Sequence, residues 1–73
     1  MELRMVSKQL PGIHVKAMVK AMKAVPQFVI EKTPTTVVVN YKAKDGKKHE
    51  VFRAIKNSKI DLWLVRHEER LFK

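Results

Sequence analysis

Residues 36–55 read TVVVNYKAKDGKKHEVFRAI and carry the strongest local signal in the chain. Two runs of β-branched and aromatic residues flank the pair Asp45 and Gly46. Such a pair predicts a β-hairpin, because a type I′ turn needs positive φ at both central residues and these residue types tolerate it. Four lysines surround the turn: Lys42, Lys44, Lys47 and Lys48. The sequence therefore predicts an apolar hairpin with a positively charged tip.

The turn length sets the register of this hairpin. A two-residue turn at Asp45 and Gly46 pairs Val39 with Phe52, and side chains then alternate between the two faces. One face holds Val37, Val39, Tyr41, Phe52 and Ala54. The other holds Val38, Asn40, Lys42, His49, Val51, Arg53 and Ile55. The alternative is a three-residue loop with a bulge at Gly46, which pairs Val39 with Val51. We prefer the first register because the alternative brings together a poorer cluster of apolar side chains on one face.

The bulk composition limits the class of protein. The chain has 73 residues, no cysteine, and 16 Lys and Arg against 7 Asp and Glu, for a net charge of +9. This length predicts one small basic domain, residues 1–73, with a thin core. Without cysteine there is neither a disulfide nor a thiolate metal site. No apolar run matches a membrane span, and the start MELRM lacks a signal-peptide core. We expect a soluble cytoplasmic protein with no membrane partner.

The positive charge is concentrated in two segments. Residues 42–59 carry seven basic side chains against Asp45 and Glu50, a net of +5. A second basic patch is formed by Lys16, Lys20 and Lys23. Such one-sidedness favours a polyanionic partner, with nucleic acid (DNA or RNA) first and an anionic membrane or an acidic protein second. The membrane is the weakest of these, because the apolar stripe of the helix is needed to cover the sheet. The alternative is that the lysines only keep a small protein soluble.

The remaining segments predict one helix and further strands. Residues 13–25 have an apolar helical stripe: Val15, Met18, Val19, Met22 and Val25. Pro26 ends the helix. Residues 27–32 and 60–66 predict strands, and in the second we expect Ile60, Leu62 and Leu64 to face the helix. Residues 1–10 predict a flexible tail or an edge strand.

These elements predict an α+β fold in which one amphipathic helix packs on a three- to four-stranded antiparallel β-meander. One helix covers one face of a sheet only. The opposite face would expose an apolar interface: Val38, Val51, Trp63 and Val65. Three covers for this face are possible: the segment of residues 1–6, the tail with Leu71 and Phe72, or a second copy of the chain, which would give a homodimer. Trp63 could alternatively serve as a stacking platform for an unpaired base.

Catalytic and metal chemistry is poorly supported. His14, His49 and His67 have no metal-ligand spacing, and two glycines cannot form a nucleotide-binding loop. A ribonuclease-type site would need His49 and Glu50 together, but neighbours on one strand point to opposite faces. We expect no enzyme activity, no cofactor, no metal, no catalytic residue and no small-molecule substrate.

The sequence favours a small non-enzymatic nucleic-acid-binding module that contacts phosphates through its hairpin tip. The predicted contact residues are Lys42, Lys44, Lys47, Lys48, Arg53, Lys56 and Lys59. The alternative is a protein-interaction or regulatory module, of a kind encoded by phages or mobile elements, that docks on an acidic partner surface. In that case the homodimer would form through the Val38, Val51 and Trp63 face.

Overall fold

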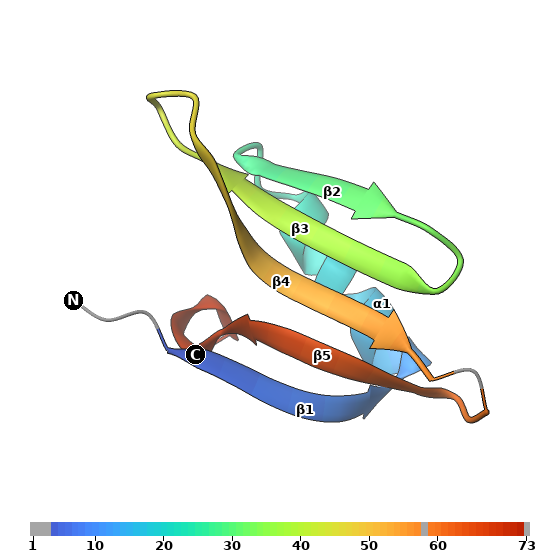
Figure 1. Ribbon diagram of the computed structural model, residues 1–73. Helices are drawn as coiled ribbons and strands as arrows, with labels where there is room; N and C mark the ends of the chain where they lie inside the picture. Colours follow the sequence, from blue (N-terminus) through green and yellow to red (C-terminus); the bar gives the residue numbers. More distant parts are fainter. Residues whose placement is uncertain (1–3, 58, 73) are drawn as a thin grey trace.

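The computed structural model describes residues 4–57 and 59–72 and has an α+β fold, with one α-helix and a five-stranded antiparallel sheet (Figure 1). The predicted class is therefore confirmed, although we expected three to four strands. The elements in chain order are β1 (Met5–Pro11), α1 (Gly12–Lys23), β2 (Phe28–Lys32), β3 (Thr36–Lys42), β4 (Lys48–Lys56), β5 (Leu62–Glu68) and the short 3-10 helix η1 (Glu69–Phe72).

The extra strand is β1, which changes the topology. The strand order is β1-β5-β4-β3-β2. Strands β2 to β5 form the meander, and β1 pairs with β5 at its edge. After β1 the chain crosses one face of the sheet as α1 and enters β2 at the opposite edge (Figure 1). Residues 5–11 are thus the edge strand that the sequence offered as one alternative, whereas residues 1–3 lie outside the described part.

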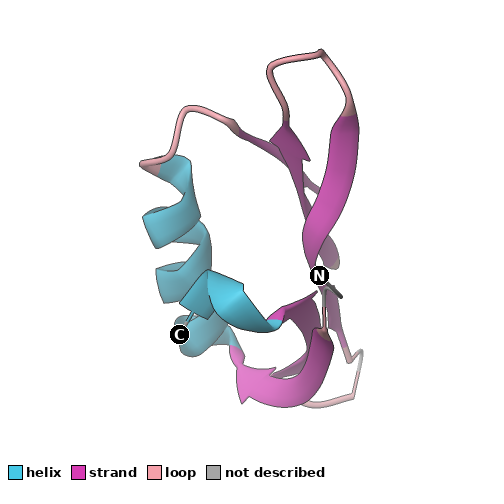
Figure 2. Ribbon diagram, turned by 90° about the vertical axis from the view of Figure 1, so that its left-hand side faces the viewer, coloured by secondary structure: helices cyan, strands magenta, loops and turns pink. Residues whose placement is uncertain are grey.

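Helix α1 follows from its periodicity. Pro11 is the N-cap and has the extended conformation that precedes a helix. Val15, Val19 and Met22 recur on one face and are buried against the sheet. The helix covers a single face of the sheet, as Figure 2 shows from the side. The core therefore lies in one layer, between α1 and the inner face of the sheet.

The β3–β4 hairpin combines both registers that the sequence allowed. Near the tip, Tyr41 pairs with His49, which is the register of a three-residue loop. Further along, Val39 pairs with Phe52, which is the register of a two-residue turn. The register shifts between Val39 and Asn40, and the additional residue on β4 is Val51. A β-bulge of this kind places two consecutive residues against one partner. Consequently Val51 and Phe52 are both buried, with exposed fractions of 2% and 0%.

Because of the bulge, two side chains of β4 that were predicted on the outer face of the sheet lie on the inner face. His49 and Val51 turn to the inner face, where the ring of His49 lies beside that of Tyr41. The loop also differs from the predicted type I′ turn. Gly46 donates its N–H to the carbonyl of Ala43, and Ala43 donates to Lys47, so three residues form the loop. Only Gly46 among the described residues has positive φ, at 87°.

The facing of β5 was also predicted wrongly. Val65 is fully buried and Trp63 packs against the core, so these residues face the helix. Leu64 is 52% exposed on the outer face. Both sides of β5 are apolar, so alternation alone does not identify the inner side. Strand pairing identifies the inner face, because cross-strand partners lie on the same face of a sheet. Trp63 is the partner of Leu10 on the neighbouring strand β1 and of Lys56 on the neighbouring strand β4.

Candidate anion-binding surfaces

The hairpin tip (residues 42–48) is the first candidate surface. It extends beyond the rest of the sheet, at the upper left of Figure 1. Its lysines, Lys42, Lys44, Lys47 and Lys48, are all exposed. The one carboxylate of the tip, Asp45, accepts a hydrogen bond from the backbone N–H of Lys47 at 3.0 Å, which stabilises the loop. Hydrogen bonds therefore close the tip, and its lysine side chains are accessible to solvent.

Within the part of the chain that the structure describes, no lysine forms an ion pair with a carboxylate. The ion pairs found there are Arg4–Glu69, His49–Glu68 and Arg53–Glu50, and none includes a lysine. Like charges gathered without partners repel one another. The positive charge at the tip is thus available to an external anion.

The other predicted contact residues do not continue the tip as one track. Arg53 lies on the outer face of β4, where Nε and Nη2 donate to Oε1 of Glu50 at 3.0 and 2.7 Å. Lys56 is three residues further along the strand and faces the helix side. Lys59 lies in the β4–β5 loop, where its backbone N–H donates to Asn57 Oδ1 at 3.0 Å. The structure therefore separates the seven predicted residues into a tip and scattered positions.

A lysine cleft between α1 and the sheet is the second candidate surface. It has a volume of about 620 Å³. Its lysines come from α1, β2 and β4: Lys16, Lys20, Lys23, Lys32 and Lys56. Asp61 and Trp63 also line it. Five lysines against one aspartate give this cleft a net charge of +4.

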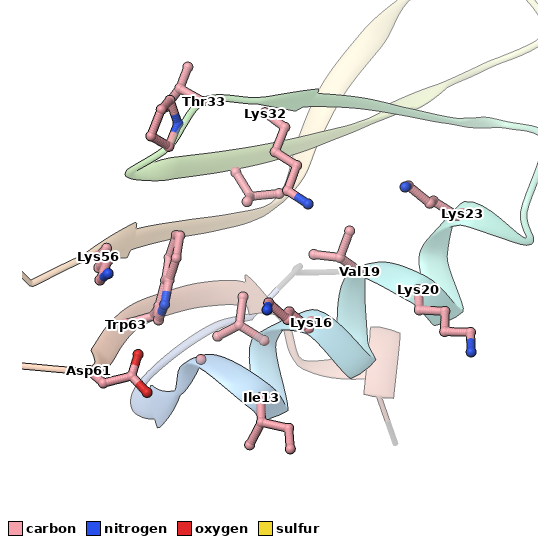
Figure 3. A pocket seen from close by; sticks show the side chains of 14 residues that line it. Ile13, Lys16, Val19, Lys20, Lys23, Lys32, Thr33, Lys56, Asp61 and Trp63 are labelled. Atoms are coloured by element: carbon pink, nitrogen blue, oxygen red, sulfur yellow. The ribbon is translucent and has the colours of Figure 1, made fainter.

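Figure 3 shows how these side chains lie around the opening. Lys32 extends from β2 toward the helix, whereas Lys20 points away from the opening. The indole of Trp63 stands at the wall near Lys56, which is its cross-strand partner. The helix stripe Lys16, Lys20 and Lys23 was predicted as a separate basic patch. The structure joins it to Lys32 and Lys56, and Lys32 had been missed because nothing in its local sequence distinguishes it.

The start of α1 closes one end of the cleft. A Cβ atom built on Gly12 would lie 2.9 Å from Asp61 Oδ1 and 3.3 Å from Trp63 Nε1. The helix thus approaches β5 and the preceding loop closely where its first residue has no side chain. Helix α1 has no acidic residue in its first turn, and Asp61 places a negative charge near that end instead.

The predicted apolar interface does not exist as one surface. Val51 and Val65 are core residues, and Trp63 lies beside α1. The bulge in β4 and the facing of β5 explain the difference. Among the four predicted residues, Val38 is the one on the outer face. The uncovered apolar side chains there include Ile55, which is 44% exposed, and its cross-strand partner Leu64.

A histidine–glutamate pair occupies the far end of the inner face. His49 Nε2 lies 3.6 Å from Glu68 Oε1, whose side chain is only 6% exposed. Glu50, by contrast, holds Arg53 on the outer face, so the two residues of the ribonuclease-type hypothesis are separated. Within residues 4–57 and 59–72, no three His, Cys, Asp or Glu side chains gather as a metal site.

Comparison with known proteins yields no match: no family model, no curated protein sequence and no solved structure is significantly similar to the chain. In the part of the chain that the structure describes, no helix combines the length and apolarity that crossing a membrane requires. The function must therefore be argued from the surfaces themselves.

Proposed function

We propose that this protein is a small, non-enzymatic nucleic-acid-binding module that holds the phosphate backbone with its hairpin tip. The observation that carries the proposal is the group of four exposed lysines on a projecting, closed loop, with no carboxylate partner among the described residues. Lysine ammonium groups bind phosphates as point charges and displace condensed counterions. A two-stranded ribbon also has the width to enter a major groove.

The chemistry of the tip favours binding that is largely independent of sequence. Lysines that reach phosphates fix the position of a protein on the strand but do not read bases. Arg53, the side chain best suited to read guanine, is engaged by Glu50 on the outer face. If each of the four tip lysines neutralises one phosphate, log K should fall against log salt with a slope of about −3.6 on duplex DNA.

Fluorescence anisotropy across a salt series tests this proposal with duplex DNA, single-stranded DNA and structured RNA. The variant Lys47→Gln/Lys48→Gln removes two charges from the tip and should make the duplex slope shallower by about 1.8. Lys8→Glu is the matched control, because it also lowers the net charge by two. It lies on β1, which pairs with β5 and not with the hairpin, so the slope should stay near that of the wild type.

Two outcomes would contradict the proposal. One is the absence of binding to every polymer at low salt. The other is an equal effect of the tip variant and the Lys8→Glu control, which would mean that net charge matters and the tip does not.

A second candidate function is docking on an acidic protein. Ile55 and Leu64 form an exposed apolar pair on the outer face, next to the paired arginines Arg53 and Arg66. A homodimer through this face would bring like charges together, so an acidic partner suits it better. The same titration discriminates the two functions, because a docking module that binds nucleic acid only through its net charge should respond equally to the tip variant and to the Lys8→Glu control.

A further inference from the structure

The lysine cleft has a composition that the hairpin tip lacks. The tip offers charge alone, whereas the cleft combines charge with an apolar floor. Val15, Val19 and Val37 line the cleft and are each no more than 4% exposed. Trp63 adds the largest aromatic surface in the chain to its wall. A ligand that fills this cleft therefore needs both an anionic part and an apolar part.

The positive charges of the cleft converge from separate elements. Lys16 and Lys23 come from α1, Lys32 from the end of β2 and Lys56 from the end of β4. Folding brings these like charges together although none of them has a carboxylate partner within the described residues. An anion bound between α1 and β2 would relieve that repulsion.

The apolar part of the ligand is best matched by a flat ring. Stacking of a nucleobase on an aromatic side chain contributes about 1–3 kcal/mol and accepts any base. Asp61 lies beside Trp63 and can accept a hydrogen bond from an amino or sugar hydroxyl group. The volume of about 620 Å³ lies within the range of small-ligand sites.

We infer that the lysine cleft binds an unpaired nucleotide, with its base against Trp63 and its phosphates between the lysines of α1 and β2. This inference rests on the proposed function, because the nucleotide would belong to a strand held by the same protein. The tip lies at one end of the sheet, and the ends of β2 and β4 that carry Lys32 and Lys56 lie at the other (Figure 1), in a molecule 40 Å long. The cleft would thus add a preference for single-stranded or frayed nucleic acid to a tip that accepts any duplex.

Tryptophan fluorescence gives a direct readout, because Trp63 is the only tryptophan in the chain. The probes are ATP, inorganic pyrophosphate, a 5′-phosphorylated tetranucleotide and a blunt, fully paired DNA hairpin. We expect ATP and the tetranucleotide to quench Trp63 emission with saturation. Pyrophosphate should compete weakly and the paired hairpin should leave the emission unchanged. Tighter binding of the tetranucleotide than of ATP would identify a strand as the source of the nucleotide, and the reverse would identify a free nucleotide.

Two matched double variants separate the cleft from the tip. Lys16→Gln/Lys32→Gln should weaken ATP binding by about tenfold, the loss expected when two solvent-exposed ion pairs to phosphate are removed. Lys47→Gln/Lys48→Gln removes the same charge and should change ATP affinity less than about twofold, since the tip does not line the cleft. On duplex DNA the order of the two effects should be reversed. All four substituted lysines are exposed, and circular dichroism checks that both variants fold.

Three results would overturn the inference: no quenching by ATP, equal affinity for ATP and pyrophosphate, or an equal loss in both double variants. Equal affinity would show that the base makes no contact. None of these results bears on the binding of paired DNA by the tip, which anisotropy measures separately. Failure of the cleft and failure of the proposed function are therefore distinguishable.

Discussion

Gly46 is the residue on which the shape of the hairpin tip depends. Its φ of 87° lies in the left-handed region, which side chains with a Cβ disfavour. A Cβ atom built there meets nothing within 4 Å, so the requirement for glycine is conformational and not steric. The backbone N–H of Gly46 closes the loop by donating to the carbonyl of Ala43 at 3.0 Å.

Gly46→Ala should therefore lower the free energy of unfolding by about 1–2 kcal/mol, the cost of the left-handed conformation for a residue with a Cβ. Gly46→Asn should lose less, because asparagine visits that region more readily. Urea denaturation of both variants measures the difference. Equal losses, or none, would mean that the loop does not hold Gly46 in this conformation.

At the scale of elements, the β-bulge at Val51 reconciles two local preferences. The loop closes around three residues, and this sets the pairing of Tyr41 with His49. The core requires Phe52 under the helix opposite Val39. These registers differ by one residue, and a one-residue slip would move every apolar side chain to the wrong face. One additional residue on β4 satisfies both.

A pair of valine-to-threonine substitutions tests the bulge. Val51→Thr buries a hydroxyl in the core and should lower the free energy of unfolding by about 1–3 kcal/mol. Val38→Thr is the matched control on the half-buried outer face and should cost less than about 0.5 kcal/mol. Thermal or urea denaturation compares them. A hairpin without the bulge would place Val51 on the outer face and bring its cost down to that of the control.

For the whole molecule, the balance of charge is the dominant property. A net charge of +9 on 73 residues opposes compaction. The two lysine groups lie at the projecting tip and around the cleft, and α1 alone bears Lys16, Lys20 and Lys23 at helical spacing. Screening by salt should reduce this self-repulsion.

Stability should accordingly rise with ionic strength. Going from about 0.01 M to about 0.1 M NaCl shortens the Debye length from about 30 Å to about 10 Å. We expect a higher melting temperature at the higher salt concentration. Circular dichroism measures the melting temperature at both concentrations. The variant Lys16→Gln/Lys20→Gln/Lys23→Gln has less charge to screen and should respond less. A melting temperature that falls with salt would show that attractive ion pairs outweigh the repulsion.

Much of the local structure could be predicted from the sequence. The helix follows from apolar residues at helical spacing, and the hairpin follows from Asp45 and Gly46 between β-branched runs. These signals are local, since each depends on residues within a few positions of one another. The lysines at the tip are equally local, because a turn places its own neighbours together.

The sequence by itself thus determined the α+β class, the helix, the hairpin and the basic tip. Only the tertiary structure decided the rest, because it depends on pairings between distant segments. The match of β1 with β5 selects Trp63 and Val65 for the inner face, although both sides of β5 are apolar. The crossing of α1 over the sheet brings Lys16 to Lys32 and Lys56, which lie 16 and 40 positions further along the chain. No local pattern encodes that convergence, because it arises from the packing of the helix across the ends of two strands.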